Sequence, residues 1–544
     1  MDKTPFAISL SPGSSTSDKT GSWRTERAVY VTSMPPCSNG CPAGEDVRGW
    51  LKDAENGGTG YESAWRQIMA ANPFPAVMGR ICYHPCESAC NREVLDESVG
   101  INSVERFLGD EAIRLGWQLA APTATGSRVL VVGAGPSGLS AAYQLALLGH
   151  AVTIKESAAE PGGMMRYGIP SYRLPRAVLD AEIDRIVALG VALELDSPVT
   201  DLAEVMAAEH FDAAFVAVGA QIGKRAYIPA GTTSHVLDAV SLLHSVADEQ
   251  PPLIGRRVAV YGGGNTAIDA ARSAKRLGAA DAVVVYRRTR ERMPASDSEV
   301  REAEEEGITF RWLSTIDHAD ADQVTLERME LDADGFPQAT GTFETLTADA
   351  IVLALGQDTD LTLLDGLNDI QVGDGVVSVD EIGMTGHPGI FAGGDIVPGE
   401  RSATVAIGHG RRAALAVDAW LRGQVAEPET SEPLADFASL NTWYFEDAPR
   451  THRAHLEAVR RASTFDEVVL GLDEETAKYE SRRCMSCGTC FSCDNCFAMC
   501  PDNAIVQLGM PGEPYAIDLD YCKGCGLCAT ECPSGAIAMV PEEI

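Results

Sequence analysis

The chain has 544 residues, a length that predicts three or four domains. A composition of 45% hydrophobic and 22% charged residues is globular and excludes a disordered or fibrous chain. The net charge of −35 argues against nucleic acid and anionic membranes and favours partners with basic faces. No apolar run reaches about 18 residues and no apolar signal segment is visible near the N-terminus, so we expect a cytoplasmic chain without a membrane span.

The first 120 residues predict an arm followed by a small metal-binding domain. Residues 1–36, which begin rich in Ser, Thr, Gly and Pro, are expected to be a flexible arm. Residues 37–120 are expected to form a helical iron–sulfur domain containing Cys37, Cys41, Cys82, Cys86 and Cys90. Clustered cysteines in a cytosolic chain favour metal binding over disulfides, and thiolates suit iron–sulfur clusters.

A first dinucleotide motif follows a short apolar run at residue 128. Its residues are Gly133, Gly135, Pro136, Ser137 and Gly138, before a helical stretch over 139–149 and a second apolar run that ends at Glu156. The glycines permit a tight turn, close approach of a pyrophosphate and close helix–strand packing. The helix N-terminus favours the anion, and Glu156 can accept a hydrogen bond from a ribose hydroxyl. This order of strand, turn, helix, strand and acid predicts dinucleotide binding.

The pattern recurs after residue 257, with Ala in place of the third glycine. The second motif consists of Gly262, Gly264, Asn265, Thr266 and Ala267. Its second strand ends in Arg287 and Arg288 rather than in an acid. Arginine suits a 2′-phosphate, so the pattern favours NADP(H). The alternative is that both arginines bind surface carboxylates and the cofactor is NAD(H).

A third motif, Gly389 to Asp395, predicts a strand that runs into a turn. Gly394 and Asp395, with Thr404 at the start of a following helix, are candidates for contact with a flavin; the alternative is a plain strand–turn. We expect an α/β chain on the two-dinucleotide reductase plan, with two Rossmann-like domains. An FAD domain (127–250 and 350–425) would be interrupted by an NAD(P) domain (251–349), followed by a connector over 426–483.

Residues 484–544 predict an α+β bacterial-type ferredoxin module. Two runs of Cys-x2-Cys-x2-Cys-x3-Cys-Pro are present, beginning at Cys490 and Cys522. In two-cluster ferredoxins the fourth cysteine of each run binds the other cluster. The predicted ligand sets are therefore Cys490, Cys493, Cys496 and Cys532 for one [4Fe–4S] cluster, and Cys500, Cys522, Cys525 and Cys528 for the other. Zinc knuckles are the alternative, but zinc does not require this spacing and proline.

The remaining cysteines predict two further clusters. Cys37, Cys41, Cys484 and Cys487 would make one complete set. Cys82, Cys86 and Cys90 lack a fourth ligand, for which Glu105 is the candidate. The alternative for Glu105 is an exposed helical carboxylate paired with a neighbouring arginine, which is the commoner situation for a glutamate.

Together these motifs resemble the glutamate synthase small (β) subunit family, which includes the flavin–NADPH half of dihydropyrimidine dehydrogenase. The matching stretches are Gly79–Cys82, Gly133–Gly138, Pro161–Gly163, Tyr167–Pro170, Gly262–Ala267, Tyr286–Arg288, Met293–Pro294 and Ala392–Asp395. The resemblance implies FAD at the first site, with Gly163 nearby, and NADPH at the second. It also implies two N-terminal clusters, one of which can take a carboxylate or carboxamide ligand; this favours Glu105.

One departure from the family changes the expected connectivity. The family's Arg-Cys-x2-Cys-Gly half-motif is missing from the N-terminal region and occurs instead at Arg483–Gly488. One cluster would then join both ends of the chain. The chain also resembles longer members with a fused ferredoxin, which act as electron-transfer subunits.

We therefore expect an NAD(P)H-coupled electron-transfer subunit containing FAD and four [4Fe–4S] clusters. Partners would be a 2-oxoacid:acceptor oxidoreductase of phenylglyoxylate or 2-oxoglutarate type, a glutamate synthase large subunit or a ferredoxin-like protein. Hydride transfer needs no protein acid or base, so no catalytic side chain is predicted. A standalone or electron-bifurcating NADPH:ferredoxin oxidoreductase and a non-catalytic scaffold are the alternatives. A flavin disulfide reductase is excluded because residues 91–483 contain no cysteine.

Overall fold

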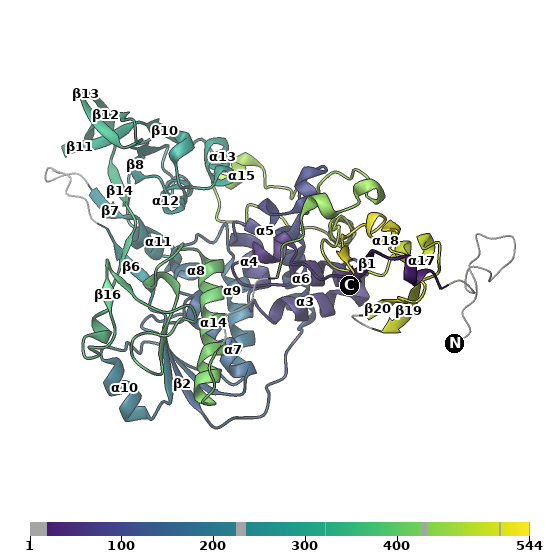
Figure 1. Cartoon of the computed structure of the whole chain (residues 1–544). Helices are drawn as coiled ribbons and strands as arrows, with labels where there is room; N and C mark the ends of the chain where they lie inside the picture. The colour runs from purple at the N-terminus through teal and green to yellow at the C-terminus, as the bar shows by residue number, and fades with distance from the viewer. Residues whose placement is uncertain (1–18, 225–234, 321, 427–431, 511–512, 543–544) are drawn as a thin grey trace.

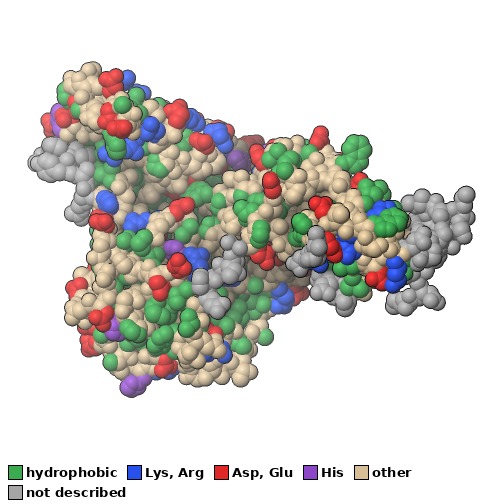
Figure 2. Space-filling view, viewed as in Figure 1, with side chains coloured by type: hydrophobic (Ala, Val, Ile, Leu, Met, Phe, Trp, Pro, Cys, Tyr) green, Lys and Arg blue, Asp and Glu red, His purple; other side chains and the backbone are tan. Residues whose placement is uncertain are grey.

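The computed structural model describes residues 19–224, 235–320, 322–426, 432–510 and 513–542 (Figure 1). Two sheets with their helices lie at one end of the molecule, the N-terminal helices occupy the middle, and the C-terminal elements, in yellow, lie at the other end. Acidic and basic side chains are interspersed over the face seen in Figure 2. None of the helices in the described ranges is long and apolar enough to cross a membrane.

The middle of the molecule is the expected N-terminal helical domain. Prolines at the first turns of α1, α4 and α5, and the Asp46 carboxylate that accepts the Gly49 N–H at the start of α2, mark where these helices begin. Its helices are α1 (Pro36–Asn39), α2 (Val47–Ala54), α3 (Tyr61–Met69), α4 (Pro75–Ile81), α5 (Pro85–Ser88) and α6 (Ile101–Leu115). Helix α16 (Glu474–Arg482), from far along the chain, packs against α2 and α6.

Two glycines let α4 and α6 cross closely. A Cβ at Gly79 would lie 2.3 Å from the Cβ of Arg106, and a Cβ at Gly109 would lie 2.2 Å from the backbone nitrogen of Ala76. Any larger residue would push the two helices apart. The crossing matters because Cys82 directly follows α4 and Glu105 lies within α6.

The first parallel sheet has the strand order β18-β5-β2-β3-β4. Its strands in chain order are β2 (Arg128–Val132), β3 (Ala151–Lys155), β4 (Ala192–Glu194), β5 (Ala213–Val216) and β18 (Ile390–Ala392). Strand β2 begins at the exposed Arg128 and is then apolar and buried from Val129 to Val132, as expected of a parallel strand that is covered on both faces. Helices α7 (Pro136–Leu147) and α14 (Ala403–Leu421) pack together against this sheet.

The second parallel sheet has the order β10-β9-β8-β14-β7. Its strands are β7 (His235–Asp238), β8 (Arg257–Gly262), β9 (Asp281–Tyr286), β10 (Thr309–Trp312) and β14 (Ala350–Ala354). Its helices are α11 (Ala239–Ala247), α12 (Asn265–Arg276) and α13 (Asp297–Glu305). The expected boundaries of 251 and 349 were wrong, because β7 and β14 lie outside them and pair with each other within this sheet.

Smaller elements complete this end of the molecule. A meander of β11 (Ser314–Asp320), β12 (Gln323–Leu331) and β13 (Pro337–Thr347) extends the second sheet's domain. Two short antiparallel pairs are also present: β6 (Ala220–Gly223) with β15 (Gln357–Thr359), in the segments that follow strands of the first and second sheets, and the hairpin of β16 (Val372–Gly373) with β17 (Val376–Val377) beside the first sheet. The remaining helices are α8 (Met164–Tyr167), α9 (Arg176–Val187) and α10 (Leu202–Glu209). The fold confirms the predicted α/β class with two dinucleotide-type sheets.

The C-terminal module includes a strand from the start of the chain. Its elements are α17 (Asn495–Met499), β19 (Ile505–Met510), β20 (Glu513–Ile517), α18 (Leu527–Thr530) and β21 (Ile537–Pro541). Strand β1 (Glu26–Tyr30) pairs antiparallel with β21, and Arg24 forms two hydrogen bonds with the Glu542 carboxylate. The expectation of a flexible arm is therefore wrong for residues 19–36; the rest of that arm lies outside the described residues.

The connector predicted over 426–483 binds three parts of the molecule together. Arg450 pairs with Glu87 in the helical domain, and the Val468 N–H donates to the carbonyl of Tyr172 in the segment between α8 and α9. Arg461, at the end of α15 (Ala458–Arg461), pairs with Glu305 at 2.6 Å beside the second sheet. These contacts hold the two dinucleotide domains against the helical domain.

Candidate functional site

One pocket of about 750 Å³ lies between the two parallel sheets. It collects residues from all three predicted dinucleotide motifs: Gly133, Gly135, Pro136, Ser137, Glu156, Gly163, Gly264, Asn265, Thr266, Gly394 and Asp395. Three other motif residues do not line the pocket but are closely packed beside it, namely Gly138, Gly262 and Ala267. Gly133 and Asp395, 262 positions apart in the chain, thus meet at the carboxyl ends of parallel strands, where this class of sheet binds ligands.

The first motif has the geometry that a pyrophosphate requires. Gly133 adopts φ +102°, and a Cβ there would lie 2.5 Å from the carbonyl oxygen of Ala217. A Cβ at Gly138 would lie 1.9 Å from the carbonyl oxygen of Gly133. Both positions therefore need glycine, and the first residues of α7, Pro136 and Ser137, line the pocket, so the helix N-terminus lies at the pocket wall. The glycine turn and the helix N-terminus at the pocket are the features that fit the pyrophosphate of a dinucleotide.

Glu156 is buried at the end of β3 with its carboxylate in the pocket wall. One carboxylate oxygen accepts the Ala134 N–H at 2.6 Å and the other accepts the Ala158 N–H at 2.8 Å. The side chain is thereby fixed next to the glycine turn, in the position from which it can reach a ribose hydroxyl.

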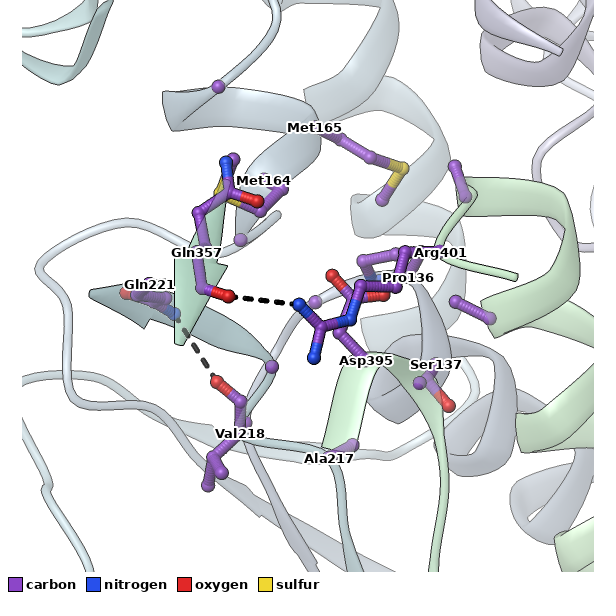
Figure 3. Close-up of a pocket in the computed structure, with 18 of the residues that line it drawn as sticks. Pro136, Ser137, Met164, Met165, Ala217, Val218, Gln221, Gln357, Asp395 and Arg401 are labelled. Atoms are coloured by element: carbon purple, nitrogen blue, oxygen red, sulfur yellow. Dashed lines mark hydrogen bonds between the residues drawn. The ribbon is translucent and has the colours of Figure 1, made fainter. Parts of the chain in front are cut away.

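Asp395 and Arg401 lie close together where they line the pocket (Figure 3). Burial raises the pKa of Asp395, and the Arg401 guanidinium partly opposes that rise. Arg401 also donates to the Gln357 carbonyl at 3.0 Å. The sequence did not indicate Arg401 because a single arginine in the loop before α14 belongs to no motif. It is the pocket's only guanidinium besides Arg173 among the described lining residues.

The second motif forms the opposite wall of the pocket. Gly262 adopts φ +155°, and a Cβ there would lie 2.2 Å from the Ala354 carbonyl oxygen. Asn265 begins α12; its amide donates to the Tyr83 hydroxyl at 2.6 Å and its carbonyl accepts the Ser296 N–H. Arg287 and Arg288 follow β9 as predicted, but neither lines the pocket; Arg287 is exposed and Arg288 half-buried.

The ferredoxin cysteines fall into the two predicted sets. Cys490, Cys493, Cys496 and Cys532 surround one small cavity, and Cys500, Cys522, Cys525 and Cys528 surround another. Burial, followed by repulsion from Cys500 and Cys522, raises the pKa of Cys528 to about 12. Thiolates crowded in this way need a positively charged iron core to stabilise them. No three His, Cys, Asp or Glu side chains in the described ranges are arranged to hold a single metal ion.

The third set joins the two ends of the chain, but with a different cysteine from the one expected. Cys37, Cys90, Cys484 and Cys487 line one cavity, so Cys90 takes the place predicted for Cys41. Burial, then repulsion from Cys484, Cys90 and Cys487, raises the pKa of Cys37. The exchange of Cys41 for Cys90 has a local cause. Helices α1 and α5 are single turns that contain Cys37 and Cys86, and the chain changes direction after each helix before it reaches the next cysteine.

Cys41, Cys82 and Cys86 are left around Glu105. Burial, followed by the charge of Glu105, raises the pKa of Cys82 to about 12. The pKa of Cys86 is raised by burial and by nearby charges that include Cys41, Cys82 and Glu105. Glu105 is 6% exposed and accepts the Asn72 amide at 3.0 Å. It is therefore not an exposed carboxylate paired with arginine, and burial raises its pKa well above the ordinary value.

Glu45 is a second buried carboxyl group near Cys41 and Glu105, and the sequence did not indicate its role. Glu45 accepts hydrogen bonds from the Trp50 indole at 3.1 Å and the Asn72 amide at 2.9 Å. Burial raises the pKa of Glu45 to about 7. Asn72 thus bridges Glu45 and Glu105. The only signal in the sequence is the position of Glu45 four residues after Cys41, which is too common a spacing to identify it.

The fourth set abuts the dinucleotide pocket. Ile81 and Tyr83, on either side of Cys82, both line the pocket. The Thr404 hydroxyl donates to the Met78 sulfur at 3.5 Å, and a hydrogen bond from Thr404 also lowers the pKa of Cys82. Thr404, expected to contact flavin, is a buried residue of α14 that does not line the pocket and bonds toward Cys82.

The fold and pocket define a two-dinucleotide reductase joined to cysteine-rich modules. A family model described as pyridine nucleotide-disulphide oxidoreductase matches residues 127–410, and the chain belongs to that family. Models for dihydropyrimidine dehydrogenase domain II, 4Fe-4S cluster, and for a 4Fe-4S dicluster domain match residues 15–117 and 489–536. The chain is an FAD-dependent NAD(P)H oxidoreductase with iron–sulfur modules, which confirms the resemblance seen in its motifs.

Three relatives are similar over most of the chain. The NADP(+)-dependent formate dehydrogenase subunit beta of Moorella thermoacetica is 35% identical over 506 residues, 84% of this chain and 71% of its own. The NADPH-Fe(3+) oxidoreductase subunit beta of Geobacter sulfurreducens is 33% identical over 83% of this chain and 75% of its own. The NAD-dependent dihydropyrimidine dehydrogenase subunit PreT of Escherichia coli is 32% identical over 71% of this chain and 91% of its own.

Proposed function

We propose that the chain is the NAD(P)H-coupled electron-transfer subunit of a larger oxidoreductase and holds one FAD and four [4Fe–4S] clusters. The observation that carries the proposal is the serial arrangement of the sites. The Cys82 set adjoins the dinucleotide pocket, and the pairs Cys37/Cys41 and Cys86/Cys90 link it to the next set. That set includes Cys487, three residues before the first ferredoxin ligand.

The protein's own groups define what each part of the pocket would do. The α7 N-terminus would bind the FAD pyrophosphate, Glu156 a ribose hydroxyl and Asp395 the chain that leads to the flavin ring. Gly264 and Asn265 would bind the nicotinamide dinucleotide at the start of α12. FAD supplies the exchange between two-electron hydride chemistry and one-electron transfer. No cysteine lies among the described lining residues, so disulfide chemistry has no site here.

The partner is proposed from chemistry and similarity together. Two of the three relatives are named as beta subunits and the third as a subunit, which supports assembly with further chains. The acidic net charge of −35 favours a partner with a basic face. Fifteen cysteines, none of which forms a disulfide, suit the cytoplasm. A 2-oxoacid:acceptor oxidoreductase, a glutamate synthase large subunit and a formate dehydrogenase are the partner classes we propose to test.

An anaerobic titration with NADPH tests the proposal directly. NADPH is expected to bleach the flavin absorbance of the complete chain and to generate the electron paramagnetic resonance signals of reduced [4Fe–4S] clusters. Reduction of the flavin without any cluster signal, while dithionite does reduce the clusters, would refute transfer from the pocket to the cysteine sets.

Glu105→Ala is expected to change the spectrum of one cluster and leave the other three unaltered, because the carboxylate would be the fourth ligand beside Cys41, Cys82 and Cys86. The signal affected should be the one removed by Cys82→Ser. Glu45→Gln is the matched control, since it keeps a side chain that can bond to Asn72. An unchanged spectrum in Glu105→Ala would exclude Glu105 as a ligand.

Arg287→Ala is expected to weaken NADPH binding about tenfold or more and NADH binding much less, because one charge-assisted hydrogen bond to a 2′-phosphate contributes about 1.5 to 3 kcal/mol. Arg290→Ala is the control, since Arg290 lies in the same loop and already pairs with Glu304. Equal losses for both nucleotides, measured by fluorescence titration, would remove the assignment of Arg287 to the 2′-phosphate.

A further inference from the structure

Strand β1 lies across both cysteine sets of the ferredoxin module. Ala28 lines the cavity of Cys500, Cys522, Cys525 and Cys528, whereas Tyr30 lines the cavity of Cys490, Cys493, Cys496 and Cys532. The two residues are two positions apart and therefore project from the same face of the strand. One strand from the start of the chain thus places an apolar methyl group at one site and a phenol at the other.

The phenol of Tyr30 contacts a predicted ligand sulfur. Its Oη lies 3.4 Å from the Sγ of Cys496. The ring stacks on Tyr515, with centroids 6.3 Å apart and planes at 18°. The pairing of Tyr30 with Ile537 fixes the backbone at this point. Position, ring plane and hydroxyl direction are therefore all set by contacts outside the cysteine run itself.

The two sites match in their backbone donors and differ in this side chain. The Ala504 N–H donates to the Cys500 sulfur at 3.2 Å, and the Ala536 N–H donates to the Cys532 sulfur at 3.3 Å. No Ser, Thr or Tyr is among the described residues that line the cavity of Cys500, Cys522, Cys525 and Cys528. Two hydroxyl groups lie at the other cavity, the one that contains Cys496 and Cys532. One is the Tyr30 hydroxyl, and the other is the Ser534 hydroxyl, 3.8 Å from the Cys532 sulfur.

We propose that Tyr30 raises the reduction potential of the cluster held by Cys490, Cys493, Cys496 and Cys532 and so makes the two ferredoxin clusters unequal. A ligating cysteine is a thiolate, so only the tyrosine can donate in this contact. Reduction adds one negative charge to the cluster, and a donor to its sulfur stabilises the more negative state. The inference rests on the proposed iron–sulfur function.

Tyr30→Phe tests the inference because it removes only the hydroxyl and keeps the ring, the stacking and the strand pairing. Reduction of one cluster should become about fivefold less favourable, which is about 40 mV at about 59 mV per tenfold for a one-electron couple. A potentiometric titration of the complete chain, followed by electron paramagnetic resonance, measures all four potentials. Cys496→Ser identifies which signal belongs to this site.

Tyr515→Phe is the matched control. It also removes a phenol hydroxyl from the stacked pair, but that hydroxyl bonds to the Asp494 carboxylate at 2.6 Å and not to a sulfur. Its potentials should equal those of the unaltered chain. The proposal is overturned if Tyr30→Phe leaves every potential unchanged, or if both variants shift the same signal equally.

A measurement on the unaltered chain keeps the inference testable even if the variant folds poorly. Electron–nuclear double resonance of the reduced chain in H2O and D2O should detect an exchangeable proton coupled to the cluster that Cys496→Ser perturbs. Its absence overturns the inference while leaving the clusters in place. Absence of iron from the chain would instead refute the proposed function.

Discussion

Replacing Cys90 by serine is expected to remove the same cluster signal as replacing Cys484, although the two residues lie at opposite ends of the chain. Both line one cavity with Cys37 and Cys487. Loss of a thiolate should lower the affinity of the chain for that cluster by more than about 100-fold. Even groups that only hydrogen-bond to a metal ligand contribute about 10- to 100-fold to metal affinity. With this link broken, NADPH should reduce the flavin but no longer the ferredoxin clusters.

Cys41→Ser is the matched comparison, since the sequence alone had placed Cys41 in the same set as Cys484. It should instead remove the signal lost in Cys82→Ser, because Cys41 lies with Cys82, Cys86 and Glu105. Iron analysis should show a loss of about four irons in each variant. If Cys41→Ser and Cys484→Ser abolish one shared signal and Cys90→Ser abolishes another, the grouping is wrong.

Gly264→Val is expected to abolish NADPH binding while the chain still folds and retains FAD. The backbone at Gly264 is extended, at φ −90° and ψ 173°, which valine adopts without strain. A Cβ there meets no protein atom within 4 Å, because it projects into the pocket at the start of α12. The side chain would occupy the space of the pyrophosphate, so affinity should fall by about 100-fold or more, or about 2.7 kcal/mol.

Gly135→Val makes the same change in the first motif, so it should abolish binding of FAD. Its Cβ also meets no protein atom within 4 Å, and its backbone is extended. This variant should lose FAD and keep its clusters. In Gly264→Val, dithionite should still reduce flavin and clusters, whereas NADPH should reduce neither. NADPH reduction at the normal rate in Gly264→Val would show that the nucleotide binds elsewhere.

The parts of the fold governed by short, local patterns could be predicted from the sequence. The glycine turns at Gly133 and Gly262 are dictated by backbone crowding within a few residues and one neighbouring strand, so they were recognisable. The crossing of Cys500 and Cys532 between the ferredoxin sets follows from a fixed spacing and is reproduced in the two cavities.

Long-range pairing could be predicted only in part: Cys37 was expected to meet Cys484 and Cys487, but Cys90 was not expected to join them. The three-residue spacing of Cys37 and Cys41 does not reveal whether the turn between them directs both side chains to one site or to neighbouring sites. Strand β1 has no partner near it in the chain; its pairing with β21, more than 500 residues away, gives no local signal. Arg401 and Glu45 are single polar residues whose roles come only from burial and neighbours.

The stoichiometry of the anaerobically purified chain tests the central claim most directly. The proposed four clusters and one FAD predict about 16 irons, an equal amount of acid-labile sulfide and about one FAD per chain. A preparation saturated at about eight irons would retain the ferredoxin clusters but contradict the two sites formed around Cys82 and Cys484.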